Sequence, residues 1–272
     1  MPKHSRKKRH LSLEEIGKCN PKAARKGIGQ SCLPDDIYKR LTRRNPRCNG
    51  EEHCLLDFAY DMPKQEREKL RRDYLRPKYP HSWESDPDEW LDNFNIEAVM
   101  KQYQVACPWF RFVGVFPIDF SIRNPYTEDK NKCLYPEICD INLKEEYKKG
   151  VRALGFVFNL DTHDKSGSHW VGLYCDIHKL YSKSGTWCAY FDSYGYQTPA
   201  FISQLMRYFY KQDPKMKLMY NGRRFQYSNS ECGMYSMYFI VCMMNDIKFR
   251  DFCKERVPDD FMLKLRTLMF RK

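Results

Sequence analysis

The sequence has no run of about eighteen apolar residues, the length that a membrane-spanning helix needs. Its first ten residues, MPKHSRKKRH, also lack the apolar stretch of a secretory signal. Internal repeats and low-complexity tracts are absent as well. These absences predict neither membrane insertion nor export, and we expect the chain to remain in a cytosol-like compartment.

Several chemical motifs are missing too. The sequence contains no phosphate-binding glycine loop, no Walker lysine and no paired carboxylates. Four cysteines near the N-terminus lie close to His53, but their spacings contain no C-x₂₋₄-C knuckle of the kind that holds structural zinc. We therefore expect neither a metal nor a cofactor. The four are Cys19, Cys32, Cys48 and Cys54.

The composition is that of a globular protein. Of the 272 residues, 42% are hydrophobic and 15% aromatic, enough for one sizeable core with an appendage, or for two small domains. Twelve cysteines spread along a large chain without a signal peptide favour free thiols over a disulfide framework.

The net charge is +12, which favours nonspecific attraction to nucleic acid or to acidic surfaces. A basic cluster at the extreme N-terminus has no apolar partners. We interpret it as a mobile, solvated arm, and a nucleic-acid-binding or nuclear-targeting role is the alternative. Its members are Lys3, Arg6, Lys7, Lys8 and Arg9.

The chain divides into two parts. Short helices are predicted from Asp35 to Arg44 and from Pro63 to Leu75, since Pro34 and Pro63 suit helix starts. The proline-rich segment from Pro77 to Asp92 reads as a connection. We therefore predict a helical arm domain at 1–91 and a core domain at 92–272.

The core is predicted to be α+β, with a central mixed sheet flanked by helices. Strands are expected at 110–118, 152–160, 169–177, 186–193 and 217–226. Helices are expected at 93–104, 199–212, 231–245 and 257–270, the first capped by Asn95 and the third apolar nearly all round.

Cys232 is the candidate nucleophile. It opens the predicted apolar helix, where unpaired backbone N–H groups favour a thiolate, and Gly233 behind it allows a substrate to approach closely. A cysteine in an apolar helix is ordinarily a small core residue. That interpretation is preferred for Cys107, Cys175, Cys188, Cys242 and Cys253.

His169 and Asp192 distinguish Cys232 from the other cysteines. The histidine begins one predicted strand and the aspartate ends the next, so antiparallel pairing would bring them together. We expect Asp192 to accept the Nδ1 proton of His169 and to leave Nε2 facing the thiol. His163 and His178 are expected to face solvent.

Three segments resemble the SUMO-protease-like clan of cysteine proteases, which includes the adenovirus protease. They are GSHW (167–170), YFDSYG (190–195) and QYSNSECG (226–233). The stretches NFNI (93–96), FPIDF (116–120) and GFVFNLDT (155–162) are most similar to the African swine fever virus-type polyprotein proteases of large DNA viruses. The resemblance covers about residues 92–272, and SCL (31–33) and EEHCLL (51–56) extend it loosely into the arm.

The resemblance implies a papain-like catalytic triad of Cys232, His169 and Asp192, although close viral relatives can carry Asn at the third position. It further implies that Gln226 donates to the oxyanion and that Trp170 is a lid that passes only glycine. The alternative is a purely structural role: Gln226 would be a polar residue at a strand end, and Trp170 would be a buried aromatic of the core. The expected activity is cleavage after Gly-Gly in structural polyproteins, in host cytoplasm and virion, by a monomer that uses no cofactor.

Two alternatives stay open. The same chemistry would suit a protease that removes ubiquitin-like or SUMO-like modifiers, whose C-termini also end in Gly-Gly. A basic nucleic-acid-binding protein that merely keeps a protease-like fold is the other.

Overall fold

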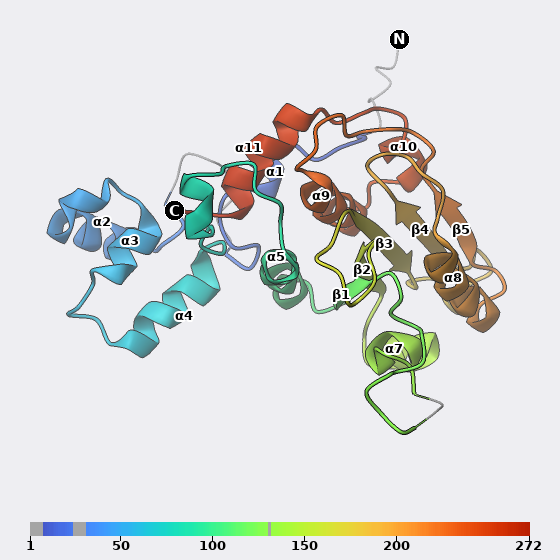
Figure 1. The fold of residues 1–272 in the computed structure, drawn as a ribbon. Helices are drawn as coiled ribbons and strands as arrows, with labels where there is room; N and C mark the ends of the chain where they lie inside the picture. Colours follow the sequence, from blue (N-terminus) through green and yellow to red (C-terminus); the bar gives the residue numbers. More distant parts are fainter. Residues whose placement is uncertain (1–7, 24–30, 130–131) are drawn as a thin grey trace, which may run out of the picture.

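The computed structural model describes residues 8–23, 31–129 and 132–272, and within them one five-stranded sheet forms the centre of the fold (Figure 1). The strands follow each other in space as they do in sequence. They are β1 (Phe110–Pro117), β2 (Ala153–Asn159), β3 (Trp170–Asp176), β4 (Trp187–Phe191) and β5 (Lys217–Tyr220).

The sheet is mixed, as predicted. β1 pairs parallel with β2, β2 and β3 are antiparallel, β3 and β4 are antiparallel, and β4 pairs parallel with β5. Side chains alternate along β3 because successive residues of a strand point to opposite faces. Leu173 belongs to one core cluster, and Trp170 and Tyr174 belong to the other.

Helices cover both faces of this sheet, which confirms the α+β class (Figure 1). On one face lie α5 (Asn93–Ala106), α9 (Cys232–Met244), α10 (Phe249–Phe252) and α11 (Asp259–Met269). On the other lie α6 (Pro136–Cys139), α7 (Leu143–Lys148) and α8 (Ala200–Gln212). Every residue of α9 is buried, as its apolar sequence predicts, since it packs between β3 and α11.

Two boundaries differ from the predictions. Helix α5 is capped by Asp92, whose Oδ1 accepts from the backbone N–H of Asn95 at 2.6 Å. In return, the Asn95 side-chain Oδ1 accepts from the backbone N–H of Asp92. Strand β5 ends at Tyr220 and not near Gln226, because the backbone N–H groups of Phe225 and Gln226 turn to the Ser193 carbonyl at 2.7 and 2.9 Å.

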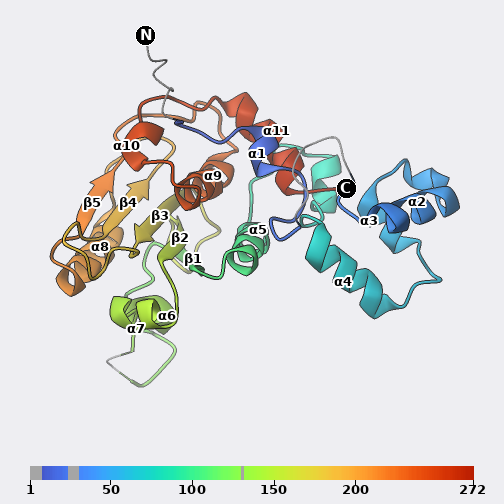
Figure 2. The same cartoon turned by 180° about the vertical axis from the view of Figure 1, so that it is seen from behind.

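The N-terminal helices form a separate small body. Figures 1 and 2 show α2, α3 and α4 standing away from the sheet, with α1, α5 and α11 between them. The arm has its own apolar cluster, which includes Leu33, Leu41, Leu55 and Leu70. Its elements are α2 (Asp35–Arg44), η1 (Pro46–Cys48), α3 (Glu52–Asp57) and α4 (Lys64–Tyr74).

Other parts of residues 1–91 pack with the sheet side. Leu11, Trp83 and Leu91 join the cluster around α9, and the Tyr238 hydroxyl donates to the Leu11 carbonyl at 2.8 Å. Leu11 precedes α1 (Leu13–Ile16), Trp83 belongs to η2 (His81–Glu84), and Leu91 precedes α5. The division into domains at 91/92 stays a prediction.

The expectation of free thiols is wrong for most cysteines. Four disulfides form, Cys19–Cys32, Cys48–Cys54, Cys133–Cys139 and Cys175–Cys188. The expectation relied on compartment and spacing, whereas the fold places the partners side by side; Cys175 and Cys188, for example, are opposite residues of β3 and β4. Free thiols remain at Cys107, Cys232, Cys242 and Cys253.

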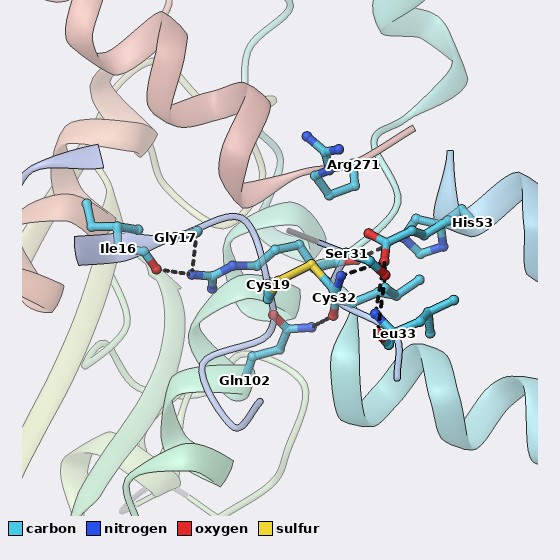
Figure 3. The surroundings of a disulfide bond; sticks show 12 residues. Ile16, Gly17, Cys19, Ser31, Cys32, Leu33, His53, Gln102 and Arg271 are labelled. Atoms are coloured by element: carbon cyan, nitrogen blue, oxygen red, sulfur yellow. Dashed lines mark hydrogen bonds between the residues drawn. A yellow bond between two sulfur atoms is a disulfide. The ribbon is translucent and has the colours of Figure 1, made fainter. Parts of the chain in front are cut away.

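The Cys19–Cys32 disulfide lies where several segments meet (Figure 3). Gln102 of α5 and Arg271 near the C-terminus lie around it in Figure 3, and the Gln102 amide donates to the Leu75 carbonyl at 2.8 Å. The disulfide therefore connects the segment that packs on the sheet side to the arm.

Of the basic N-terminal cluster, Lys3, Arg6 and Lys7 lie outside the described residues. The other two do not behave as a free arm, because Lys8 pairs with Glu15 and Arg9 pairs with Glu255 at 2.8 Å. No helix in the described ranges is long and apolar enough to cross a membrane.

Candidate active site

Cys232 is the first residue of α9, at the position predicted for the nucleophile. It is buried, and the backbone N–H of Trp170 lies 3.5 Å from its Sγ. The helix N-terminus and this N–H both favour negative charge on sulfur. The surroundings therefore suit a thiolate.

His169 directly precedes β3 and Asp192 directly follows β4, and the antiparallel pairing of these strands brings the two side chains together. His169 Nε2 lies 2.8 Å from Asp192 Oδ1, and Asp192 is fully buried. The predicted meeting of histidine and acid is thus found in the structure.

The nitrogen assigned to each partner was wrong. The structure pairs Asp192 with Nε2, not Nδ1, which leaves Nδ1 for the thiol. The Asp192 carboxylate, at the end of the neighbouring strand, thus meets the ring nitrogen that lies farther from the His169 backbone.

The pKa of His169 results from opposing effects. Burial alone would lower it, but the hydrogen bonds to Asp192 and Cys232, together with their charges, raise the pKa of His169 to about 9. The imidazolium is therefore stable at neutral pH. A protonated imidazole beside the nucleophilic sulfur is an arrangement that thiol catalysis uses.

Asn221 fixes the acid in place, and the sequence analysis missed it. Its Oδ1 accepts from the backbone N–H of Asp192, and its Nδ2 donates to the Asp192 carbonyl, both at 2.8 Å. The N–H of Tyr194 adds a 2.8 Å bond to Asp192 Oδ1. An asparagine in the middle of the strand predicted at 217–226 gave no signal of this role.

Gln226 is fully buried and its amide is held at both ends. Oε1 accepts from Ser193 Oγ at 2.6 Å, and Nε2 donates to the Ser228 carbonyl at 2.9 Å. Because a primary amide has two N–H donors, one remains for another acceptor. Ser193, for which the sequence analysis predicted no role of its own, sets the amide orientation.

Trp170 is anchored by the connecting segment. Its Nε1 donates to the Leu91 carbonyl at 2.7 Å. A Cβ added at Gly233 would lie 3.0 Å from Leu91 Cδ1 and 3.3 Å from Trp170 Cδ1. Gly233 thus lets Leu91 and Trp170 pack tightly against the nucleophile's helix, and its predicted role toward substrate stays a prediction.

A cavity of about 400 Å³ lies beside Trp170 and is lined by the loop at 161–167. The expectation for His163, in this loop, was wrong: it does not simply face solvent, because its Nδ1 lies 2.6 Å from Asp119 Oδ2. The sequence separation of the two residues hides this pair. His178 is exposed, as expected.

Within the ranges that the structure describes, no group of three His, Cys, Asp or Glu residues could hold a metal ion. Cys19, Cys32, Cys48 and Cys54, the set considered for zinc, are paired in disulfides.

Comparisons with known proteins agree with this chemistry. Residues 144–271 match the model of the "Ulp1 protease family, C-terminal catalytic domain". Protein R355 of Acanthamoeba polyphaga mimivirus, named a thiol protease, is 27% identical over 234 residues, which cover 82% of this chain and 70% of the relative.

Cysteine protease S273R of African swine fever virus is 25% identical over 254 residues, covering 89% of this chain and 91% of the relative. The crystal structure of the African swine fever virus pS273R protease superimposes with a TM-score of 0.70 at 22% identity, over 93% of this chain and 95% of that one. The likeness extends through the arm as well as the sheet.

Proposed function

Residues 144–271 belong to the Ulp1 protease family, and we propose that this cysteine protease is an endopeptidase that cleaves after Gly-Gly in Gly-Gly-X sequences. Its natural substrates are structural polyproteins of a large DNA virus, cut during virion maturation in host cytoplasm and in the virion. The similarity to mimivirus and African swine fever virus proteases supports the viral setting.

One observation carries the proposal. A thiol at a helix start, an imidazole paired to a buried carboxylate and an amide with a spare donor all converge at one end of the sheet. Cys232 Sγ attacks the peptide carbonyl, and the Gln226 amide with the Cys232 N–H receives the oxyanion. The proton on His169 passes to the leaving amine, and water then resolves the acyl-enzyme.

Trp170 supports the choice of glycine. Its indole is held by the hydrogen bond from its ring N–H to Leu91, and its backbone N–H lies 3.5 Å from Cys232 Sγ. We infer that a substrate residue that passes beneath this ring must lack a Cβ, which favours glycine before the scissile bond.

The test compares peptides of the type Gly-Gly-X and Gly-Ala-X, with wild type and the variants Cys232→Ser and Cys253→Ser. We expect cleavage of the Gly-Gly peptide by wild type and by Cys253→Ser, and none by Cys232→Ser. No cleavage of any peptide, with rapid release of a ubiquitin-like or SUMO-like modifier, would favour the deconjugating alternative.

Thiol labelling provides a second measurement. Burial raises the pKa of Cys107, and raises the pKa of Cys242 and of Cys253 to about 12. At pH 6 to 7, iodoacetamide should therefore modify Cys232 first. Equal labelling of Cys232 and Cys253 would contradict an activated nucleophile.

A further inference from the structure

We propose that Arg224, held between Tyr194 and Tyr227, binds an acidic side chain from one of the first three residues after the scissile bond. The inference rests on the proposed function and deepens it. It assigns a substrate preference on the leaving-group side of the site.

The proposed catalytic mechanism indicates where the leaving-group side of the site lies. His169 delivers its proton to the leaving amine, so the chain that departs must begin next to the imidazole. Tyr194 stacks on this imidazole with 4.6 Å between ring centroids and 24° between planes. The departing segment therefore passes along Tyr194, away from Trp170 and the Leu91 segment.

Arg224 lies immediately beyond. Its guanidinium carbon is 5.2 Å from the Tyr194 ring centroid and 4.6 Å from that of Tyr227. Its Nε donates to the Gln226 carbonyl at 2.7 Å. An extended chain advances about 3.3–3.6 Å per residue, so a side chain one to three positions beyond the bond reaches this group.

The charge of Arg224 has no acidic partner in the described part of the chain, where neither Nη1 nor Nη2 forms a hydrogen bond or an ion pair. Arg256 makes the contrast clear. It also lies over Tyr227, at 4.3 Å, but its Nη2 is paired with Asp259 at 3.0 Å. The Nη1 and Nη2 groups of Arg224 are thus held in one orientation and can donate to a bound ligand.

A carboxylate fits this edge best. The planar guanidinium of an arginine can bind both oxygens of a carboxylate. The two tyrosine rings and the hydrogen bond from Nε restrict the movement of the Arg224 guanidinium. Arg224 is exposed, so an extended peptide can reach its guanidinium. The same exposure lets solvent screen the two charges, which limits the gain in binding free energy.

The experiment uses fluorogenic Gly-Gly peptides of one length, with Glu or Gln at each of the first three positions after the bond. At low ionic strength we expect wild type to prefer Glu at one position by about fivefold in kcat/KM. Arg224→Gln should reduce this ratio to about one, and Arg224→Glu should reverse it in favour of the Gln peptide. The ratio is the readout because Arg224 also braces the Gln226 backbone, and its loss lowers all rates together.

Arg223 supplies the matched control. It is the exposed neighbour whose Nη1 donates to the Lys254 carbonyl, so Arg223→Gln should keep the Glu preference. Equal cleavage of Glu and Gln peptides by wild type at all three positions would overturn the inference and leave the proposed function intact. Failure of wild type to cleave any Gly-Gly peptide would instead remove the proposed function.

Nucleic acid is the other polyanion that such an edge could attract. Binding of a short single-stranded oligonucleotide should therefore be measured in the same variants. If Arg224→Gln weakened that binding and left the Glu-to-Gln ratio unchanged, the acidic-peptide subsite would be wrong.

Discussion

Trp170 Nε1 donates a 2.7 Å hydrogen bond to the carbonyl of Leu91, a residue 79 positions earlier in the chain. The bond makes the end of the connecting segment part of the active site. Arg266 reinforces it, because its Nη1 donates to the Glu89 carbonyl at 2.7 Å in the same segment.

Replacing Trp170 by Phe should test this anchor. The ring stays but the donor is lost, so we expect kcat/KM for a Gly-Gly peptide to fall about two- to tenfold and cleavage of Gly-Ala peptides to rise relative to it. Trp109→Phe, at the opposite end of the sheet, is the control. Unchanged selectivity in Trp170→Phe would show that the hydrogen bond does not hold the lid.

The pH profile should report the His169–Asp192 pair. The pKa of His169 is raised from 6.5 to about 9, so the imidazolium persists as pH rises and is lost above about 9. We expect kcat/KM to fall on this alkaline limb, because the imidazolium supplies the proton that the leaving amine takes. In Asp192→Asn the carboxylate charge is gone, and the limb should move to lower pH. An identical limb in both proteins would contradict the pairing.

Gln226 should matter for turnover more than for binding. Gln226→Ala is expected to lower kcat by about 10²–10³ with little change in KM, as for loss of one oxyanion donor. Ser193→Ala keeps the amide but frees Oε1, so its loss should be smaller. Thermal unfolding of both variants checks that the fold survives; a normal kcat in folded Gln226→Ala would exclude the oxyanion role.

The residue before the nucleophile forms a buried ion pair. Glu231 Oε1 lies 2.8 Å from Arg266 Nη2, and both side chains are almost fully buried. Arg266→Met leaves the acid uncompensated and should lower the free energy of unfolding by about 3–5 kcal/mol. The double variant Glu231→Leu, Arg266→Met should recover most of that in denaturant unfolding. Equal losses in single and double variants would argue against a coupled pair.

The arm can be removed without cutting into the catalytic side. The Asn20 N–H donates to the Tyr74 carbonyl at 2.9 Å, so a short glycine linker can replace residues 21–73, with Cys19→Ser. If the arm provides a second substrate contact, short peptides should be cleaved normally and KM should be about tenfold higher for a folded polyprotein substrate. Equal KM values would remove a substrate-binding role. Truncation at residue 91 is unsuitable, because it removes Leu11, Trp83 and Leu91 from the core.

The sequence predicted the elements that have strong local signals. The helix from Asp35 to Arg44 has the predicted bounds, and all five strands were placed, because proline starts and aromatic runs are local features. Cys232, His169 and Asp192 could be grouped because antiparallel pairing of two strands follows from a short connection.

What the sequence could not provide depends on distant contacts. Which ring nitrogen faces Asp192 depends on the orientation of the His169 side chain in the folded site, and the support from Asn221 requires β5 to end early. The pairing of Cys19 with Cys32 likewise needs the segment around α1 to return to the arm. None of these appears as a periodicity or a motif.

The chain combines a cysteine that must stay reduced for catalysis, Cys232, with other cysteines that are joined in disulfides. A reducing agent added to protect Cys232 during purification can also open Cys19–Cys32 at the arm and Cys175–Cys188 between β3 and β4. The specific activities of preparations made with and without dithiothreitol should therefore be compared only after the thiols have been counted.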